Sequence, residues 1–217
     1  MISKYFSNKN SFDLIEDPIK QNTGSGYWYL QGKNNQEYCW NNEVFSDNEI
    51  ERIKVIGRRL GVDRSYTSDS GKNCLDHRRS YNSWIHQNEY TNWIYERLTD
   101  LIIENNNLFF NFDLTMIENL QFTYYNSKEN GCYKSHVDPI SWNLPHNRKL
   151  SIVVQLSDPN EYEGGEINLY YSNKPITIKK EKGYVVSFPS YVLHEVTPVT
   201  KGERYSLVIW VHGPAFK

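Results

Sequence analysis

The segment from Tyr133 to Asp138 carries side chains suited to binding a metal ion. On a β-strand, residues i and i+2 point to the same face, so His136 and Asp138 present an imidazole and a carboxylate side by side. His194 lies in a second strand-like segment, and we expect it to supply another imidazole from across a β-sandwich. Two histidines and one carboxylate on one face of a metal ion leave three octahedral positions open, as chemistry at non-haem Fe(II) requires, whereas a structural zinc site is closed.

An arginine follows the second histidine at a spacing that brings it to the same interior. The segment 198–202 predicts a turn, so we expect a hairpin that carries His194 and Arg204 on its two strands. Arginine is the side chain suited to two-point binding of a carboxylate inside a pocket. From Arg204 the two-residue period continues through Ser206 to Trp210, which places Trp210 on the pocket wall. The opposite face is expected to be plain core and consists of Tyr205, Leu207, Ile209 and Val211.

Two helices are expected ahead of these strands. Ser46 and Glu49 form a capping-box pattern followed by apolar residues at helical spacing, which predicts a helix over 47–60 that a glycine closes. A second apolar stripe predicts a helix over 88–105, ended by a run of asparagines. The segment 80–85 between them has the composition of a strand.

From Leu108 onward the apolar period changes to two, which is typical of β-strands. Strand-like segments separated by turn residues cover 118–125, 150–157, 166–171, 175–179, 184–188, 191–196 and 204–212. Many short antiparallel strands indicate a sandwich or barrel. We therefore predict one α+β, mainly β domain over 1–217, in which 1–107 forms a helical and strand support packed on one sheet and 108–217 forms the β core.

The composition disfavours several classes of protein. The 217 residues include 24 Lys+Arg and 26 Asp+Glu, a net charge of −2, so no basic field favours nucleic acid or an anionic membrane. Cys39, Cys74 and Cys132 form no CxxC pair, which disfavours a thiolate zinc site or a disulfide framework and favours a reducing compartment. The N-terminal residues lack an apolar signal segment, and the apolar stretches are strand-sized, so we expect a cytoplasmic protein without a membrane span.

Several motifs occur in a fixed order between about Phe110 and Val211. They are YY at 124–125, GCYKSHVD at 131–138, LSDP at 156–159, YEGGE at 162–166, FPS at 188–190, LHEVTPV at 193–199, GERYS at 202–206 and Trp210. In this order and spacing they resemble the 2-oxoglutarate- and Fe(II)-dependent dioxygenases. The similarity is to the prolyl 4-hydroxylase-like branch, which includes the bacterial PKHD-type hydroxylases. A set of ordered motifs is far more specific than the HxD triplet alone.

The resemblance implies a double-stranded β-helix, a jelly-roll or cupin-like fold, with iron held by His136, Asp138 and His194. It also implies that Arg204 binds the distal carboxylate of 2-oxoglutarate, whose other end chelates the metal. In the family, O₂ drives oxidative decarboxylation of 2-oxoglutarate to succinate and CO₂, and the substrate gains a hydroxyl group. Ascorbate is a further cofactor expected from the family. The protein supplies binding, orientation and exclusion of water, while the iron carries the chemistry.

Five further residues are expected to contact the cosubstrate. They are Tyr125, Tyr133, Gln155, Ser206 and Trp210. The two tyrosines precede the HxD strand, where relatives use phenol hydroxyls; a role as ordinary half-buried strand aromatics is an equally weighted alternative. Gln155 stands where relatives often carry a cosubstrate-binding tyrosine, which leaves the second partner of the distal carboxylate open, with Thr123 as a substitute.

Other conspicuous residues receive plainer interpretations. Gly164 and Gly165 are expected to form a turn rather than to take part in catalysis. Arg78 and Arg79 are expected to be solvated loop charges, with contact to an anionic or peptide substrate as the alternative. Trp142 is a candidate lid over the iron. The remaining histidines are expected in loops or at the surface and are His77, His86, His146 and His212.

The leading functional hypothesis is hydroxylation of a prolyl residue in a protein or peptide. The same cofactor chemistry on a small molecule or nucleobase is one alternative, and a non-catalytic, metal-binding cupin-like module is the other. The complete ligand set together with Arg204 favours an enzyme over the module. The sequence specifies neither the substrate nor the oligomeric state.

Overall fold

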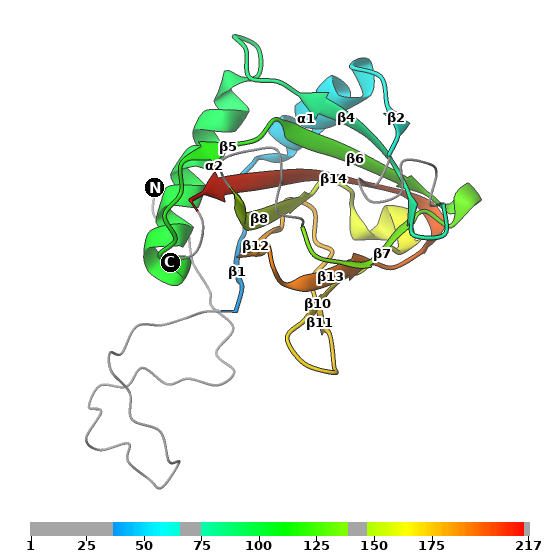
Figure 1. Cartoon of the computed structure of the whole chain (residues 1–217). Coiled ribbons are helices and arrows are strands. Elements are labelled where there is room, and N and C mark those ends of the chain that lie inside the picture. The colour runs from blue at the N-terminus through cyan, green and yellow to red at the C-terminus, as the bar shows by residue number, and fades with distance from the viewer. Residues whose placement is uncertain (1–36, 66–74, 139–146, 215–217) are drawn as a thin grey trace, which may run out of the picture.

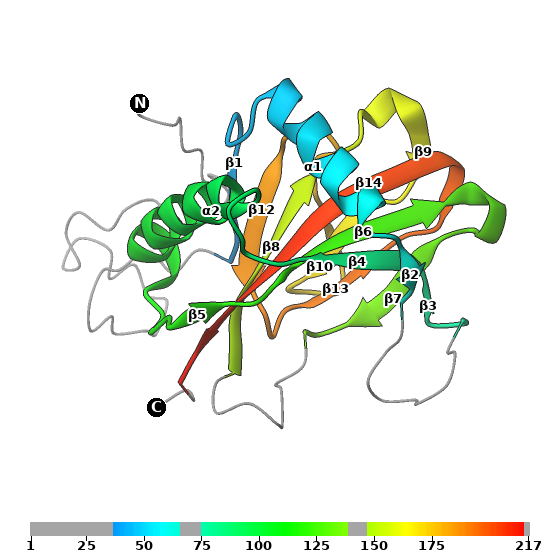
Figure 2. The ribbon, with the colours of Figure 1, turned by 90° about the horizontal axis from the view of Figure 1, so that it is seen from above.

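The computed structural model describes residues 37–65, 75–138 and 147–214. In this part of the chain two antiparallel β-sheets lie face to face, and two helices cover the outer face of the larger sheet (Figures 1 and 2). The predicted mainly β fold with helices packed on one sheet is therefore confirmed. Neither helix among the described residues is long and apolar enough to cross a membrane.

Helix α1 (Asp47–Arg59) begins where the capping-box pattern predicts. The Ser46 hydroxyl accepts a hydrogen bond from the Glu49 N–H at 3.4 Å, and the Glu49 carboxylate accepts one from the Ser46 N–H at 2.8 Å. Two backbone donors at the start of the helix are thereby satisfied. The buried face, which starts at Ile50, packs on the larger sheet. Gly61 follows the helix with a φ of 78°, a left-handed conformation that glycine adopts without strain.

Helix α2 (Asn92–Asn105) begins later than predicted, because two polar side chains bind the backbone ahead of it. The Asn88 N–H donates to Thr91 Oγ1 at 3.0 Å, and Asn88 Oδ1 accepts from the Tyr90 N–H at 2.9 Å. Such bonds favour a turn over a helix. The predicted end at residue 105 is confirmed, and a π-helical turn, η1 (Asn106–Phe110), follows α2 directly.

The larger sheet has nine strands in the described part of the chain, with the long β14 (Val199–Gly213) near its centre. The order is β1-β12-β8-β14-β6-β4-β2, and β5 and β9 also pair with β14. The other strands of this sheet are β1 (Cys39–Asn41), β2 (Asp63–Arg64), β4 (Tyr81–Ile85), β5 (Met116–Ile117), β6 (Leu120–Asn126), β8 (Asn147–Gln155), β9 (Tyr162–Gly164) and β12 (Val185–Pro189).

The smaller sheet has five strands in the order β11-β10-β13-β7-β3 within the described ranges. They are β3 (Arg78–Arg79), β7 (Cys132–His136), β10 (Ile167–Tyr170), β11 (Ile176–Thr177) and β13 (Leu193–Val196). Two short 3-10 turns, η2 (Ser127–Glu129) and η3 (Pro159–Glu161), lie in connections between strands. All seven strand segments predicted from the two-residue period correspond to observed strands, with shifted ends.

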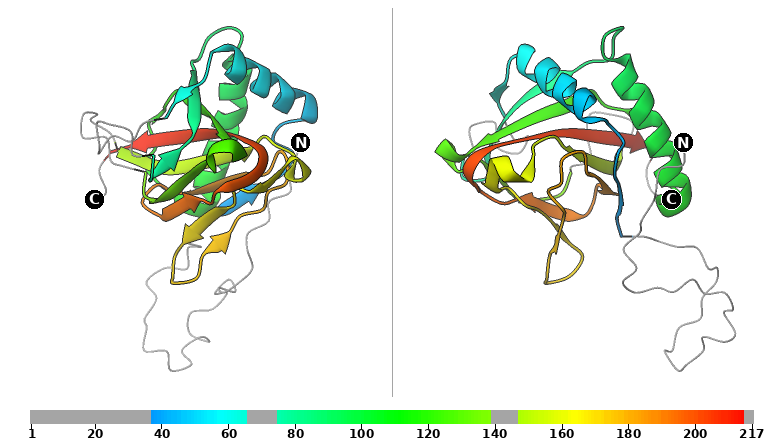
Figure 3. Two further views of the ribbon diagram at one scale, coloured as in Figure 1. Left: turned by 90° about the vertical axis from the view of Figure 1, so that its right-hand side faces the viewer. Right: turned by 180° about the vertical axis from the view of Figure 1, so that it is seen from behind.

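Alternation along β8 and β14 divides their side chains between two cores. Ile152 and Leu207 belong to the apolar cluster beneath the helices, whereas Val153 and Val208 pack in the cluster between the sheets. The predicted core face of β14 is therefore confirmed. Figure 3 shows the helices on one side of the larger sheet and the smaller sheet on the other. The inner face of β14 points into the space between the sheets, where a site can be enclosed.

The predicted hairpin between the strands of His194 and Arg204 is wrong. β13 pairs with β10 and β7 in the smaller sheet, whereas β14 pairs with β6 and β8 in the larger one. Pro198 lies between them and has no N–H to continue a ladder. The chain changes sheets at this point, so His194 and Arg204 reach one cavity from opposite sheets.

Helix α1 lies very close to the larger sheet at Gly57. A Cβ atom at this position would lie 2.3 Å from Cγ of Phe122, whose ring is fully buried on β6. We expect Gly57→Ala to lower the free energy of unfolding by about 1–2 kcal/mol. Overpacking costs about 1–3 kcal/mol, and the higher helix propensity of alanine offsets up to about 1 kcal/mol of this cost. Urea unfolding measures this, with Val55→Ala on the exposed face of α1 as the control. Equal midpoints for Gly57→Ala and wild type would contradict the packing argument.

Candidate metal centre

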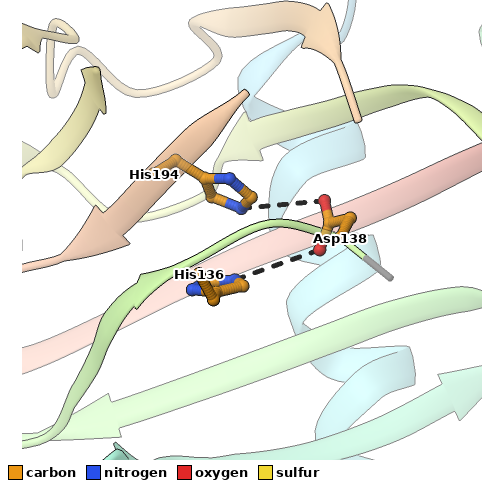
Figure 4. Close-up of side chains that lie close together, drawn as sticks. All are labelled: His136, Asp138 and His194. Atoms are coloured by element: carbon orange, nitrogen blue, oxygen red, sulfur yellow. Dashed lines mark ion pairs between the residues drawn. The ribbon is translucent and has the colours of Figure 1, made fainter. Parts of the chain in front are cut away.

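The three predicted metal ligands meet at one end of the smaller sheet (Figure 4). His136 is the last residue of β7, and His194 on β13 lies directly opposite it in the antiparallel pairing. The prediction that His194 reaches across the sandwich is therefore wrong, because both imidazoles come from the same sheet. Asp138 follows β7, and its N–H donates to the carbonyl of Ser190, the residue after β12, at 3.0 Å, which holds this segment beside the end of β12 in the larger sheet.

The three side chains converge around one point. His136 Nε2 lies 3.9 Å from Asp138 Oδ1, and His194 Nε2 lies 3.6 Å from Asp138 Oδ2. One potential ligand atom from each residue lies within 4.8 Å of the others. Bonds of about 2.0–2.2 Å from nitrogen and oxygen ligands to a divalent ion fit a group of this size with small side-chain movements.

Hydrogen bonds determine which nitrogen of each histidine faces the centre. His136 Nδ1 donates to the Lys134 carbonyl at 2.7 Å, and His194 Nδ1 donates to the Val192 carbonyl at 2.8 Å. Because a carbonyl oxygen only accepts, Nδ1 carries the proton and Nε2 presents its lone pair. Burial and the neighbouring His194 lower the pKa of His136 to about 3, which keeps this imidazole neutral, as metal binding requires.

Asp138 is held as a carboxylate by its neighbours. Ser151 Oγ donates to Asp138 Oδ2 at 2.5 Å and lies 2.9 Å from Ser190 Oγ. Burial raises the pKa of Asp138, but the facing imidazoles of His194 and His136 and the Ser151 hydroxyl outweigh it, so this pKa lies below its usual value. Two imidazole nitrogens and one anionic oxygen are the donor set that suits Fe(II) with open coordination positions. The residues present therefore fit an iron ion.

The Ser151 hydroxyl is expected to contribute to metal affinity without touching the metal. Ser151→Ala removes the donor that orients the Asp138 carboxylate, and loss of such a partner weakens metal binding about 10–100-fold. Anaerobic competitive titration with Fe(II), or titration with Mn(II) in air, measures the change. Ser187→Ala, at a serine buried outside the site, is the matched control. A metal affinity within threefold of wild type in Ser151→Ala would contradict this role.

Arg204 extends the site on the side of the larger sheet. Its side chain is 1% exposed, and its Nη2 donates to Gln155 Oε1 at 3.0 Å and its Nη1 to Ser206 Oγ at 3.4 Å. Its Nε has no hydrogen-bond partner, and no carboxylate of the described residues lies within ion-pair distance of the guanidinium. Burying a cation beside neutral partners alone costs folding free energy. Arg204 is therefore suited to bind an anion from outside the chain.

Gly165 makes room for this arginine. A Cβ atom on Gly165 would lie 2.9 Å from Arg204 Cδ, and its φ of 66° is one that other residues adopt with strain. The predicted turn is not found at Gly164 and Gly165: Gly164 is the last residue of β9 and Gly165 begins the connection to β10, although both have the positive φ that glycine adopts without strain. The second glycine also shapes the cavity, which the sequence interpretation missed.

One cavity connects the three ligand side chains with Arg204, and four of the five predicted cosubstrate contacts line it. They are Tyr125, Tyr133, Ser206 and Trp210. Tyr133 stacks on His136 with ring centroids 3.4 Å apart and planes inclined by 15°. Gln155 is not on the cavity wall and instead binds the guanidinium of Arg204. The substitute Thr123 donates to Gln121 at 3.2 Å. Their roles toward a cosubstrate stay predictions.

Two ionisable residues lie in places that the sequence interpretation did not expect. His212, expected in a loop or at the surface, is fully buried, and its Nε2 contacts the Glu118 carboxylate. Arg78, expected to be solvated, is 8% exposed and lines the cavity. His86 is exposed as predicted, and His77 is half-buried against Tyr133. The candidate lid Trp142 and His146 lie outside the described residues.

The fold and the donor set together define the class of protein: a double-stranded β-helix with a two-histidine, one-carboxylate metal site and a buried arginine in the same cavity. A family model described as the 2OG-Fe(II) oxygenase superfamily matches residues 120–212. A PKHD-type hydroxylase of Sphingopyxis alaskensis is 31% identical over 174 residues, which cover 78% of this chain and 76% of that protein. The chain belongs to the 2OG-Fe(II) oxygenase superfamily, whose cofactors are Fe(II), 2-oxoglutarate and O₂.

Other relatives match over a shorter length or by fold. A PKHD-type hydroxylase of Teredinibacter turnerae is 36% identical over 88 residues, so the match spans 39% of this chain and 39% of that relative. A prolyl-4-hydroxylase of Pseudomonas putida superposes with a TM-score of 0.66 at 19% identity, covering 82% of this chain and 94% of that chain. A prolyl hydroxylase of Trichoplax adhaerens, solved with a hypoxia inducible factor peptide fragment, gives a TM-score of 0.66 at 19% identity over 81% and 83%. These likenesses confirm the predicted fold.

Proposed function

We propose that this chain is an Fe(II)- and 2-oxoglutarate-dependent dioxygenase that hydroxylates a prolyl residue in a protein or peptide. The observation that carries the proposal is a single cavity that contains the His136, Asp138 and His194 face and the buried Arg204, which has no carboxylate partner among the described residues. Membership of the superfamily supports the cofactors. The prolyl substrate is supported by the printed descriptions of two structural neighbours, one a prolyl-4-hydroxylase and one a prolyl hydroxylase with a peptide fragment.

Each group has a task in this reaction. His136, Asp138 and His194 would hold the iron, which with 2-oxoglutarate and O₂ supplies the oxidation of a substrate C–H bond to C–OH, with succinate and CO₂ as the other products. Arg204 binds the distal carboxylate of 2-oxoglutarate with a guanidinium whose Nε has no hydrogen-bond partner among the described residues, and Gln155 holds the guanidinium through Nη2. The surrounding apolar side chains exclude water and thereby strengthen this charge pairing.

The proposal is tested by succinate formation from 2-oxoglutarate. Protein loaded anaerobically with Fe(II) is exposed to O₂ alone and then with proline-containing peptides, and each peptide is analysed for a mass gain of about one oxygen atom. We expect peptide-dependent turnover in wild type and strongly reduced turnover in Arg204→Ala at a 2-oxoglutarate concentration near the wild-type KM. Iron binding without succinate formation under any condition would overturn the proposal in favour of a non-catalytic metal-binding module.

Two finer predictions accompany the proposal. A reducing, cytoplasmic environment is supported by Cys39 and Cys132, which are buried and free. Burial raises the pKa of the Cys39 thiol, so it is inert rather than reactive. Use of ascorbate as an additional reductant stays a prediction from the family resemblance.

A further inference from the structure

A second buried arginine lies in the same cavity. Arg78 on β3 is 8% exposed and is paired in register with Tyr133 on β7. Its guanidinium carbon lies 4.5 Å from the centroid of the Tyr133 ring, and that ring stacks on His136. Arg78 is therefore two stacked layers away from a metal ligand, on a strand of the smaller sheet, whereas Arg204 belongs to the larger sheet.

Among the described residues, hydrogen bonds hold the Arg78 guanidinium at Nε and Nη2. Nε donates to Ser80 Oγ at 2.8 Å, and Nη2 donates to Gln121 Oε1 at 3.0 Å. Both partners are neutral. In the described part of the chain Nη1 has no hydrogen-bond partner, and no carboxylate there lies within ion-pair distance of Arg78. A guanidinium can bind a carboxylate at two points through Nη1 and Nη2, and Arg78 can do so with Nη1 and the second hydrogen of Nη2.

The charges of the proposed site, taken with the described residues, give Arg78 no counter-ion. With iron and 2-oxoglutarate bound, the two positive charges of Fe(II), the Asp138 carboxylate, the two carboxylates of 2-oxoglutarate and Arg204 sum to zero. Arg78 then adds one positive charge at a buried position, where an unpaired charge is costly. Arg78 is also not needed for 2-oxoglutarate, since Arg204 provides its distal partner.

We propose that Arg78 binds a carboxylate of the substrate and so selects a substrate that carries a negative charge beside the carbon that is hydroxylated. This inference rests on the proposed function and deepens it by naming a substrate class. The carboxylate has two possible sources: an acidic side chain next to the target proline, or the terminal carboxylate of a short or free substrate. Stacking on Tyr133 alone would make Arg78 a positioning residue for His136, a role that does not discriminate between charged and neutral substrates.

Peptide binding to the Mn(II)-loaded protein with saturating 2-oxoglutarate tests the inference without turnover. The probes are end-blocked peptides with Asp or Asn on either side of proline, a neutral peptide that ends in proline with a free or an amidated C-terminus, and free proline. Dissociation constants are measured by isothermal titration calorimetry. Wild type, Arg78→Gln and Arg79→Gln are compared, the last as a matched control on the same strand.

For one of the two carboxylate sources, we expect the charged probe to bind about 10–100-fold more tightly than its neutral isostere. Wild type and Arg79→Gln should both show this preference. In Arg78→Gln this preference should vanish while the neutral probe binds as before. A preference for Asp over Asn identifies an acidic side chain as the source of the carboxylate. A preference for the free over the amidated C-terminus identifies the terminal carboxylate. Arg78→Lys, which keeps the charge, should retain part of the preference, and this variant decides the question if Arg78→Gln is unstable.

Three results would overturn the inference: equal affinities for charged and neutral probes in wild type, a preference that persists in Arg78→Gln, or no binding of any probe. A purely positioning role would instead weaken charged and neutral probes alike. Failure of the proposed function is distinguishable, because it appears as absence of succinate formation even when carboxylate probes bind with the expected preference.

Discussion

Asp138→Ala is expected to abolish metal-dependent turnover and to weaken metal binding by more than about 100-fold. The carboxylate is the only anionic side chain of the ligand group, and loss of a residue that merely orients a ligand already costs about 10–100-fold. Anaerobic titration with Fe(II) and the succinate assay measure the two effects separately. Circular dichroism establishes that the variant keeps its β-sheets.

The matched control is Glu195→Gln. Glu195 adjoins the ligand His194 in sequence, yet it points to the other face of β13, where it accepts from Asn168 Nδ2 at 2.9 Å and from the Tyr170 hydroxyl at 2.5 Å. We expect metal affinity close to wild type in this variant. If Asp138→Ala bound Fe(II) within tenfold of wild type, or if Glu195→Gln lost as much affinity, the ligand assignment would be wrong.

The sequence predicts the identity of the ligand group better than its arrangement. His136 and Asp138 are two residues apart, so proximity along the chain brings them together, although Asp138 lies beyond the end of β7 and its position depends on Ser190 and Ser151. His194 and Arg204 depend on how distant strands pair. The local sequence pattern predicts each strand but not the sheet to which the strand belongs. At Pro198 the chain passes from the smaller sheet to the larger one instead of forming a hairpin. The hairpin prediction failed there, although both side chains still reach the same cavity.

Buried polar residues are the other part that the sequence does not predict. Arg78 and His212 have side-chain types that usually lie at the surface. Their burial depends on partners far along the chain, Gln121 for Arg78 and Glu118 for His212. Ser151 did leave a signal, because it is the single hydroxyl in the otherwise apolar run from Leu150 to Val154. Its function becomes visible only when Asp138 is placed beside it.

Loss of the Arg204 guanidinium is expected to raise the KM for 2-oxoglutarate by roughly 30-fold or more. Removing one partner of a buried, hydrogen-bonded charge pair costs about 2 kcal/mol or more, because the carboxylate of the cosubstrate is then buried without a counter-charge. Arg204→Gln also removes the donor that satisfies Gln155 Oε1. Metal affinity should stay close to wild type, since no metal ligand contacts Arg204 through a hydrogen bond among the described residues.

Arg204→Lys separates charge from geometry. Lysine keeps the positive charge but not the planar fork, so we expect a KM between those of wild type and Arg204→Gln. Arg59→Gln, at an exposed arginine in the last turn of α1, controls for loss of one positive charge. A change in kcat with unchanged KM would place Arg204 in the chemical step rather than in cosubstrate binding. Equal KM values for 2-oxoglutarate in all three variants would show that Arg204 does not bind this cosubstrate. The buried guanidinium would then have to bind a different anion.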